Sequence, residues 1–314
     1  MDRRRVALGV AMAIGFMLVV QVGGLLLVTP FEAAGYEAVE DGTDPAYGAA
    51  LFAVVLVATV LLLLAMRYGL QSLIRAMIVG VSGLLGWYVA SVAPFDVGVA
   101  GVDIFPLGVA AAVILALAVH PEWYVIDATA LLVGAGAAGM FGLSFTVLPI
   151  VILLVVLAVY DAISVYGTRH MLTLAEGAMT MNLPVLVVIP LSRKFSVRHL
   201  AEAPPEQASG EPDEPEERNA IFLGLGDLVI PSILVVSAAF HGIGGGVVTV
   251  AGLDLGWAVL GAVGGSILGL AGLLALVERG GPQAGLPLLN GGVLLGYLLG
   301  ALLDGVDLLT AVGL

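Results

Sequence analysis

Long apolar runs constrain the fold of this chain more than any other sequence feature. Most of them reach the roughly 20 residues that a helix needs to cross about 30 Å of hydrocarbon. Hydrophobic residues make up 60% of the chain and charged residues 11%, against roughly 45–50% and 25% in soluble domains. We therefore predict an all-α polytopic membrane protein and exclude a soluble enzyme. Charges and Gly/Pro clusters delimit nine predicted spans, at residues 6–28, 47–66, 70–93, 104–120, 125–142, 146–168, 220–240, 255–277 and 286–303.

The basic residues set the predicted orientation, because Lys and Arg collect on the cytoplasmic side of membrane proteins. With nine spans and a cytoplasmic N terminus, that side holds all eleven of them: Arg3, Arg4, Arg5, Arg67, Arg75, Arg169, Arg193, Lys194, Arg198, Arg218 and Arg279. A different number of spans would break this segregation. We therefore predict a cytoplasmic N terminus and a C terminus outside.

A polar stretch divides the chain into two blocks of spans. Residues 201–218 are acidic, rich in proline and without apolar periodicity, so we expect a disordered cytoplasmic loop over residues 193–219. It separates a predicted six-helix block, residues 1–192, from a three-helix block, residues 220–314.

The apolar segment 171–192 at the end of the first block is not predicted to cross the membrane. It contains Glu176, Pro184 and Pro190, which suit a bilayer-crossing helix badly. Counting it as a tenth span would also place Arg193 and its basic neighbours outside. An interfacial or re-entrant segment is the better prediction.

Composition excludes several kinds of chemistry. The chain has no cysteine, which rules out disulfides, thiol nucleophiles and iron–sulfur clusters. Its four histidines are widely spaced, so we expect no metal site and no cofactor. The net charge of −13 makes nucleic acid a poor partner.

Two acidic residues lie well inside predicted spans: Asp161 in the sixth and Asp227 in the seventh. A carboxylate inside the bilayer is costly and marks a functional site by default. Asp161 lies eight residues before Arg169, and Asp227 nine residues after Arg218, which corresponds to about 12 and 13.5 Å along a helix. Because the two helices run antiparallel from the same side, we expect both carboxylates at the same depth, facing each other. Glu122 and Asp127, by contrast, frame a short cytoplasmic turn and are expected to be solvated.

Two functions fit a pair of buried carboxyl groups. Held a few ångströms apart in a low-dielectric site, the two groups cannot both ionise and share one proton. That is the arrangement of aspartic proteases, in which one member activates water and the other donates a proton to the peptide carbonyl. The alternative is a secondary transporter or ion channel that uses both carboxylates for proton or cation coupling. A transporter would not need both acids at one depth beside glycines.

Three short motifs on these spans resemble those of the presenilin / signal peptide peptidase family, and the resemblance covers the chain in order and topology. They are Tyr160-Asp161 in the sixth span, Gly224-Leu225-Gly226-Asp227 in the seventh, and Pro287-Leu288-Leu289 at the start of the ninth. The compact loops fit a prokaryotic member. The resemblance implies a nine-helix, presenilin-like fold and an intramembrane aspartyl protease of the GxGD type.

The resemblance also assigns roles to these residues. Asp161 and Asp227 would be the catalytic dyad, with the active-site or substrate-binding residues Tyr160, Gly224, Leu225 and Gly226 beside them. Pro287, Leu288 and Leu289 would match the family's Pro-Ala-Leu element, which shapes the active site, although leucine stands here in place of the alanine.

The resemblance further implies the partners of the chain. The substrates would be transmembrane helices of single-pass proteins, or their remnants, within the lipid bilayer of the cell membrane. The sequence leaves the oligomeric state open, a homo-oligomer included.

Overall fold

In the computed structural model, residues 3–37, 39, 42–95, 97–99, 102–168, 186–190, 220–242, 245–250, 252–278 and 283–314 are described. Within these ranges an apolar helix overlaps each of the nine predicted spans, although two of these helices are short. The helices are α1 (Arg3–Ala33), α2 (Ala46–Arg67), α3 (Gln71–Ser91), α4 (Phe105–Val119), α5 (Trp123–Ser144), α6 (Val147–Ile163), α10 (Leu225–His241), α11 (Trp257–Glu278) and α12 (Leu286–Leu303). A π-helical turn, η1 (Ser164–Thr168), extends α6, and a short helix, α13 (Leu308–Val312), follows α12.

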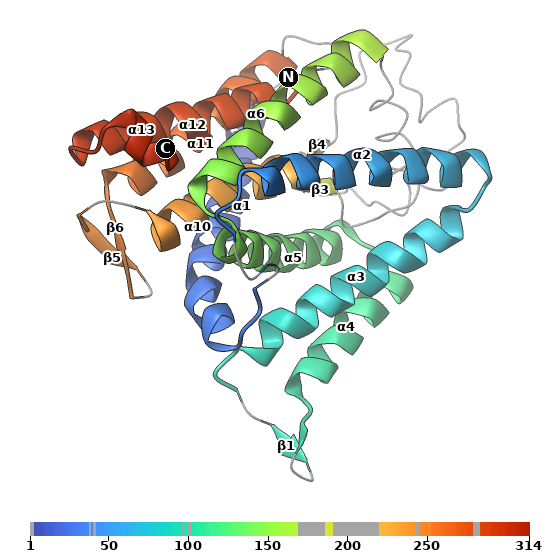
Figure 1. Cartoon of the computed structure of the whole chain (residues 1–314). Helices are drawn as coiled ribbons and strands as arrows, with labels where there is room; N and C mark the ends of the chain where they lie inside the picture. Colours follow the sequence, from blue (N-terminus) through green and yellow to red (C-terminus); the bar gives the residue numbers. More distant parts are fainter. Residues whose placement is uncertain are drawn as a thin grey trace.

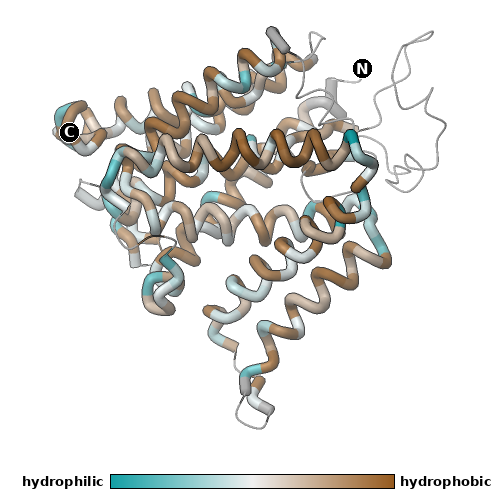
Figure 2. Tube along the Cα trace, turned by 45° about the vertical axis from the view of Figure 1, so that its right-hand side comes forward, coloured by the Kyte–Doolittle hydropathy of each residue, from teal (hydrophilic) through white to brown (hydrophobic). Residues whose placement is uncertain are grey.

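Seven of these described helices are long and apolar enough to cross a membrane. The other two, α4 and α10, have 15 and 17 residues. Large hydrophobic side chains face outward along the helices, among them Leu61, Leu268 and Leu299, and in Figure 2 the long helices are brown over much of their length. Such an exterior suits hydrocarbon rather than water, as predicted for a multi-pass membrane protein.

The core of the bundle forms where α1, α5 and α10 pack against one another. Met17 and Phe31 of α1 and Leu234 of α10 are fully buried there. Figure 1 shows α3 and α4 side by side as a hairpin that ends in β1. The helix α2 packs on α6, and α6 in turn packs on both α10 and α12.

Glycines bring α11 and α12 unusually close together. A Cβ atom on Gly265 would overlap the carbonyl group of Gly292, with its carbon only 2.9 Å away, and would lie 3.0 Å from Cα of Gly296. Small residues at this spacing allow two membrane helices to approach backbone to backbone. The position of α12 is therefore set by its contact with α11.

Three short antiparallel strand pairs connect described helices: β1 (Gly98–Val99) with β2 (Val102–Asp103), β3 (Leu186–Pro190) with β4 (Ala220–Gly224), and β5 (Val248–Val250) with β6 (Leu253–Leu255). The pair β3–β4 joins residues far apart in sequence, with Leu186 opposite Gly224 and Pro190 opposite Ala220. It is the pair that leads into α10.

The strand β4 corrects one predicted boundary. The seventh span was predicted to begin at residue 220, but residues 220–224 are extended and the helix begins at Leu225. The sequence Ala-Ile-Phe-Leu-Gly suits a strand as well as a helix by hydrophobicity alone, and pairing with β3 decides between them. Of the segment 171–192, the part 186–190 is the strand β3. Residues 171–185 and the predicted loop 193–219 lie outside the described residues.

Candidate active site

Asp161 lies near the C-terminal end of α6, with 6% of its surface exposed. Its Oδ2 atom accepts a hydrogen bond from the backbone N–H of Leu286 at 3.1 Å. Leu286 is the first residue of α12, and the first N–H groups of a helix have no partner within the helix. The carboxylate of Asp161 thus caps α12, and α6 and α12 meet at this atom.

Asp227 lies in the first turn of α10 and is partly buried. Its Oδ2 atom would lie 3.2 Å from a Cβ on Gly224 and 3.1 Å from a Cβ on Gly285. Any larger residue at either position would press on the carboxylate. The absence of side chains at these two glycines therefore makes room for the carboxylate of Asp227.

The two carboxyl groups converge on the residues just before α12. Asp227 lies against Gly285, and Asp161 is bonded to the next residue, Leu286. They are near enough for their charges to act on each other. Two carboxyl groups in this position can share one proton, hold a water molecule between them and exchange protons with a bound carbonyl group.

The other residues predicted on α6 and α10 take different positions. The ring of Tyr160 meets the ring of Phe52 of α2 edge-on, with centroids 5.7 Å apart. Leu225 points at α5, because a Cβ on Gly134 would lie 3.2 Å from its Cδ1. Gly226 is exposed. The backbone at Gly224 and Gly226 therefore borders Asp227, whereas the Leu225 side chain belongs to the packing between α10 and α5.

The three residues predicted at the start of α12 also divide between the site and the core. Pro287 lies beside the bonded N–H of Leu286 and lines a groove between α6 and α12. Leu288 is partly buried against the core, and Leu289 is fully buried within it. Pro287 is thus the member of this element that lines the groove between α6 and α12.

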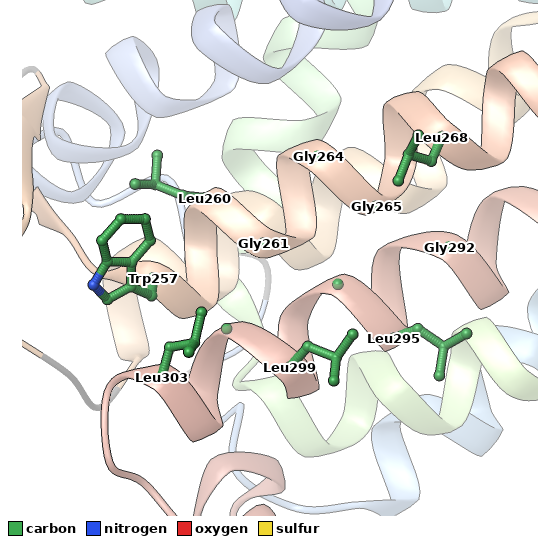
Figure 3. A pocket seen from close by; sticks show the side chains of 12 residues that line it. Trp257, Leu260, Gly261, Gly264, Gly265, Leu268, Gly292, Leu295, Leu299 and Leu303 are labelled. Carbon is green, nitrogen blue, oxygen red and sulfur yellow. The ribbon is translucent and has the colours of Figure 1, made fainter.

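That groove lies at the surface of the bundle and includes Ala162, the chain neighbour of Asp161, but neither Asp161 nor Asp227 lines it. It has a volume of about 320 Å³ and is lined by Val155, Ala158, Val159 and Ala162 of α6 and by Pro287, Asn290, Gly291 and Leu294 of α12. A second groove, of about 530 Å³, runs along the glycines of α11 and α12. Figure 3 shows Trp257 and Leu303 at one end of it. It touches neither aspartate.

Two polar residues that the sequence did not single out join α12, and the residues just before it, to α6 and η1. Asn290 is fully buried, and its Nδ2 donates to the carbonyl oxygen of Leu154 at 2.8 Å. The hydroxyl of Tyr166 donates to Oε1 of Gln283 at 3.1 Å and accepts from the N–H of Ala284 at 3.2 Å. The contact of Asn290 could have been suspected from the sequence, because an Asn inside an apolar run is unusual. Nothing in the sequence pointed to the contacts of Tyr166.

The expectation that Asp127 is solvated is wrong. Asp127 is 4% exposed, and its Oδ1 accepts a hydrogen bond from the N–H of Val188 at 2.7 Å. Asp127 is the fifth residue of α5, and the sequence predicted a turn just before this helix. The strand β3 covers that end of the helix, and strand pairing with β4 was not foreseen. In the described part of the chain, no three His, Asp or Glu residues gather as a metal site would require.

Comparison with known proteins agrees with this geometry. Residues 14–306 match the family described as signal-peptide peptidase, presenilin aspartyl protease. A solved structure of a presenilin family intramembrane aspartate protease, in a C222 crystal, is 36% identical, covers 94% of this chain and 99% of its own, and superposes with a TM-score of 0.66. Another, in a P2 crystal, is 34% identical over 92% and 96% of the two chains, with a TM-score of 0.60. No curated protein matches the chain.

Proposed function

Since the chain belongs to the signal-peptide peptidase and presenilin family of aspartyl proteases, it is a multi-pass intramembrane aspartyl protease, and we propose that Asp161 and Asp227 are its catalytic dyad. The observation that carries this assignment is the convergence of both carboxyl groups on Gly285 and Leu286. Family membership also decides against the transporter or channel alternative.

The proposed chemistry needs only water and the two carboxyl groups. One carboxylate takes a proton from water as the water oxygen bonds to the peptide carbonyl carbon, and the other carboxyl group gives its proton to the carbonyl oxygen. The C–N bond of the tetrahedral intermediate then breaks as the carboxyl group that took the water proton gives it to the nitrogen, while the other carboxylate takes a proton from one hydroxyl of the intermediate. The products are a carboxylic acid and an amine, and the pair again holds one proton.

The glycines beside Asp227 support the GxGD subtype. Gly224 and Gly226 flank Leu225, and neither carries a side chain that would keep a substrate backbone away from the carboxylate. A helical peptide bond is shielded by its own turn, so the substrate must be extended at the bond that is cut. The strand β4 ends at Gly224, which is consistent with an extended backbone beside it.

We propose that the groove between α6 and α12 receives the substrate helix beside the dyad. It is lined almost entirely by apolar groups and includes Ala162, next to Asp161, and Pro287, next to Leu286. A transmembrane helix of a single-pass protein could pack along such an apolar groove while its unwound end reaches the carboxylates. We therefore propose substrates of this kind, or their remnants.

A cleavage assay in liposomes tests the dyad. The native chain is expected to cut a single-pass substrate whose N terminus is outside, and Asp161→Asn and Asp227→Asn are expected to cut nothing. Asp254→Asn is the matched control, because Asp254 is exposed on β6, and it should retain activity. Cleavage by either dyad variant at the native rate would refute the assignment.

Nine spans with a cytoplasmic N terminus remain the proposed topology, including the shorter helices α4 and α10. The chain has no cysteine, so single cysteines can be labelled without background. Glu37 and Tyr68 are exposed beyond opposite ends of α2. In sealed right-side-out vesicles, an impermeant maleimide should label Glu37→Cys and leave Tyr68→Cys unlabelled; the reverse pattern would contradict the orientation.

A further inference from the structure

Asp127 is a buried acidic residue that the proposed reaction does not use. Its Oδ1 accepts the N–H of Val188, 61 residues away, whereas its Oδ2 has no hydrogen-bond partner among the described residues. Burying a carboxylate is costly, and a single hydrogen bond offsets only part of that cost. Stability alone therefore does not account for an acid at this position.

The bond from Asp127 falls on the outer edge of β3. In an antiparallel pair, successive residues point their N–H groups alternately toward the partner strand and away from it. Val188 lies opposite Phe222 of β4, but its N–H is taken by Asp127, so it points away from β4. Pro190, on the same edge, has no N–H. At Val188 and Pro190, β3 therefore has no N–H group free to bond a further strand, and the carboxylate of Asp127 occupies the place where such a strand would pair.

Side chains around this bond attach β3 to the start of α5. Ile126, next to Asp127, and Val188 are both buried in one apolar cluster, with Trp123 and Phe222 packed against it. Apolar packing alone would let β3 shift by two residues along α5 and keep the same face buried. The hydrogen bond prevents such a shift, because the carboxylate of Asp127 accepts from one particular N–H group, that of Val188. Asp127 thus sets where β3 lies along α5.

A shift of β3 would reach Asp227 through β4. Leu186 of β3 lies opposite Gly224, the last residue of β4. Gly224 is also the residue before α10, and Asp227 lies three residues on with its carboxylate against it. There is no intervening loop in which a shift of the strand pair could be absorbed. A displacement of β3 therefore moves the backbone that borders Asp227.

We propose that Asp127 is a positioning residue: its carboxylate closes the outer edge of β3 and fixes the register of β3–β4, and thereby the alignment of the substrate backbone with the dyad. The proposal rests on the proposed function of Asp161 and Asp227. It predicts an effect on where the substrate is cut as well as on how fast.

The test compares two substitutions at the same position. Asp127→Asn keeps an oxygen that accepts the Val188 N–H, and Asp127→Val removes it with little change in volume. Product masses give the distribution of cleavage positions, and rates at several substrate concentrations separate kcat from KM. We expect Asp127→Val to spread cleavage over neighbouring peptide bonds and to lower kcat about tenfold or more, since misplacement by 1 Å can cost about 100-fold. Asp127→Asn should retain the native positions.

A second variant breaks the same bond from the strand. Val188→Pro removes the N–H without altering α5, at an edge position where proline is tolerated, and it should spread cleavage as Asp127→Val does. This keeps the proposal testable if Asp127→Val does not fold.

Two results would overturn the proposal. One is native cleavage positions and native kcat in folded Asp127→Val or Val188→Pro; the other is a defect in Asp127→Asn as large as that in Asp127→Val. Both are distinct from a failure of the proposed function, which would appear as activity in Asp161→Asn or Asp227→Asn in the same assay.

Discussion

Two adjacent glycines of α11 should respond in opposite ways to the same substitution. Gly265 is buried against α12, where a Cβ would overlap the carbonyl group of Gly292 and lie 3.0 Å from Cα of Gly296. Gly264 is exposed, and a Cβ there would meet no atom within 4 Å. The added methyl group is identical, and so is its effect on helix propensity. Any difference between the two variants therefore reports the contact with α12.

The magnitude follows from the distances. Ordinary van der Waals contact begins at about 3.4 Å, so Gly265→Ala forces backbone against backbone apart by about half an ångström or more, and rigid overpacking of this kind costs about 1–3 kcal/mol. We expect a loss at the upper end, because a backbone cannot rotate away as a side chain can. Gly264→Ala should be neutral or stabilise by up to about 1 kcal/mol through helix propensity.

Thermal unfolding in detergent, measured by tryptophan fluorescence, gives the comparison, and cleavage activity adds a second readout. Because α12 begins at the N–H that is bonded to Asp161, Gly265→Ala should lower activity at temperatures where it is still folded. Equal unfolding temperatures for the two alanine variants would refute the reasoning, as would a larger loss in Gly264→Ala.

Three further outcomes are expected. Asn290→Leu removes both the bond to Leu154 and a buried oxygen that has no partner among the described residues, so its unfolding free energy should change by no more than about 1 kcal/mol while cleavage falls; unchanged cleavage would contradict a role in placing α12. Asp304→Ala removes the acceptor for the N–H groups of Trp257 and Ala258, which should cost about 1 kcal/mol of stability and leave the cleavage rate intact. The rate of cleavage should follow a bell-shaped pH profile, because activity requires that the two carboxyl groups hold one proton between them; a profile without an acidic limb would argue against a shared proton.

The positions of the helices could be predicted from the sequence because each helix in a bilayer must satisfy its own backbone and be long enough to cross. These requirements apply to each helix separately, so the length of an apolar run in the sequence indicates them. The matched depth of Asp161 and Asp227 stays a prediction, made by counting residues from the basic ends of two helices. Their meeting was an inference from antiparallel helices of matched depth, and the contacts of both with residues 285 and 286 agree with it.

What the sequence did not determine are the contacts between segments distant along the chain. The strand β4 has the same apolar composition as a helix turn, and only pairing with residues 186–190 makes it extended. The same pairing buries Asp127, which looked like a loop residue when its neighbours alone were considered. Asn290 and Tyr166 likewise act on partners in other elements. Hydropathy is a property of one segment, so it could predict where the apolar helices lie and which of them carry Asp161 and Asp227. Strand register, buried hydrogen bonds and the alignment of α12 with α6 belong to pairs of segments, and tertiary packing alone decided them.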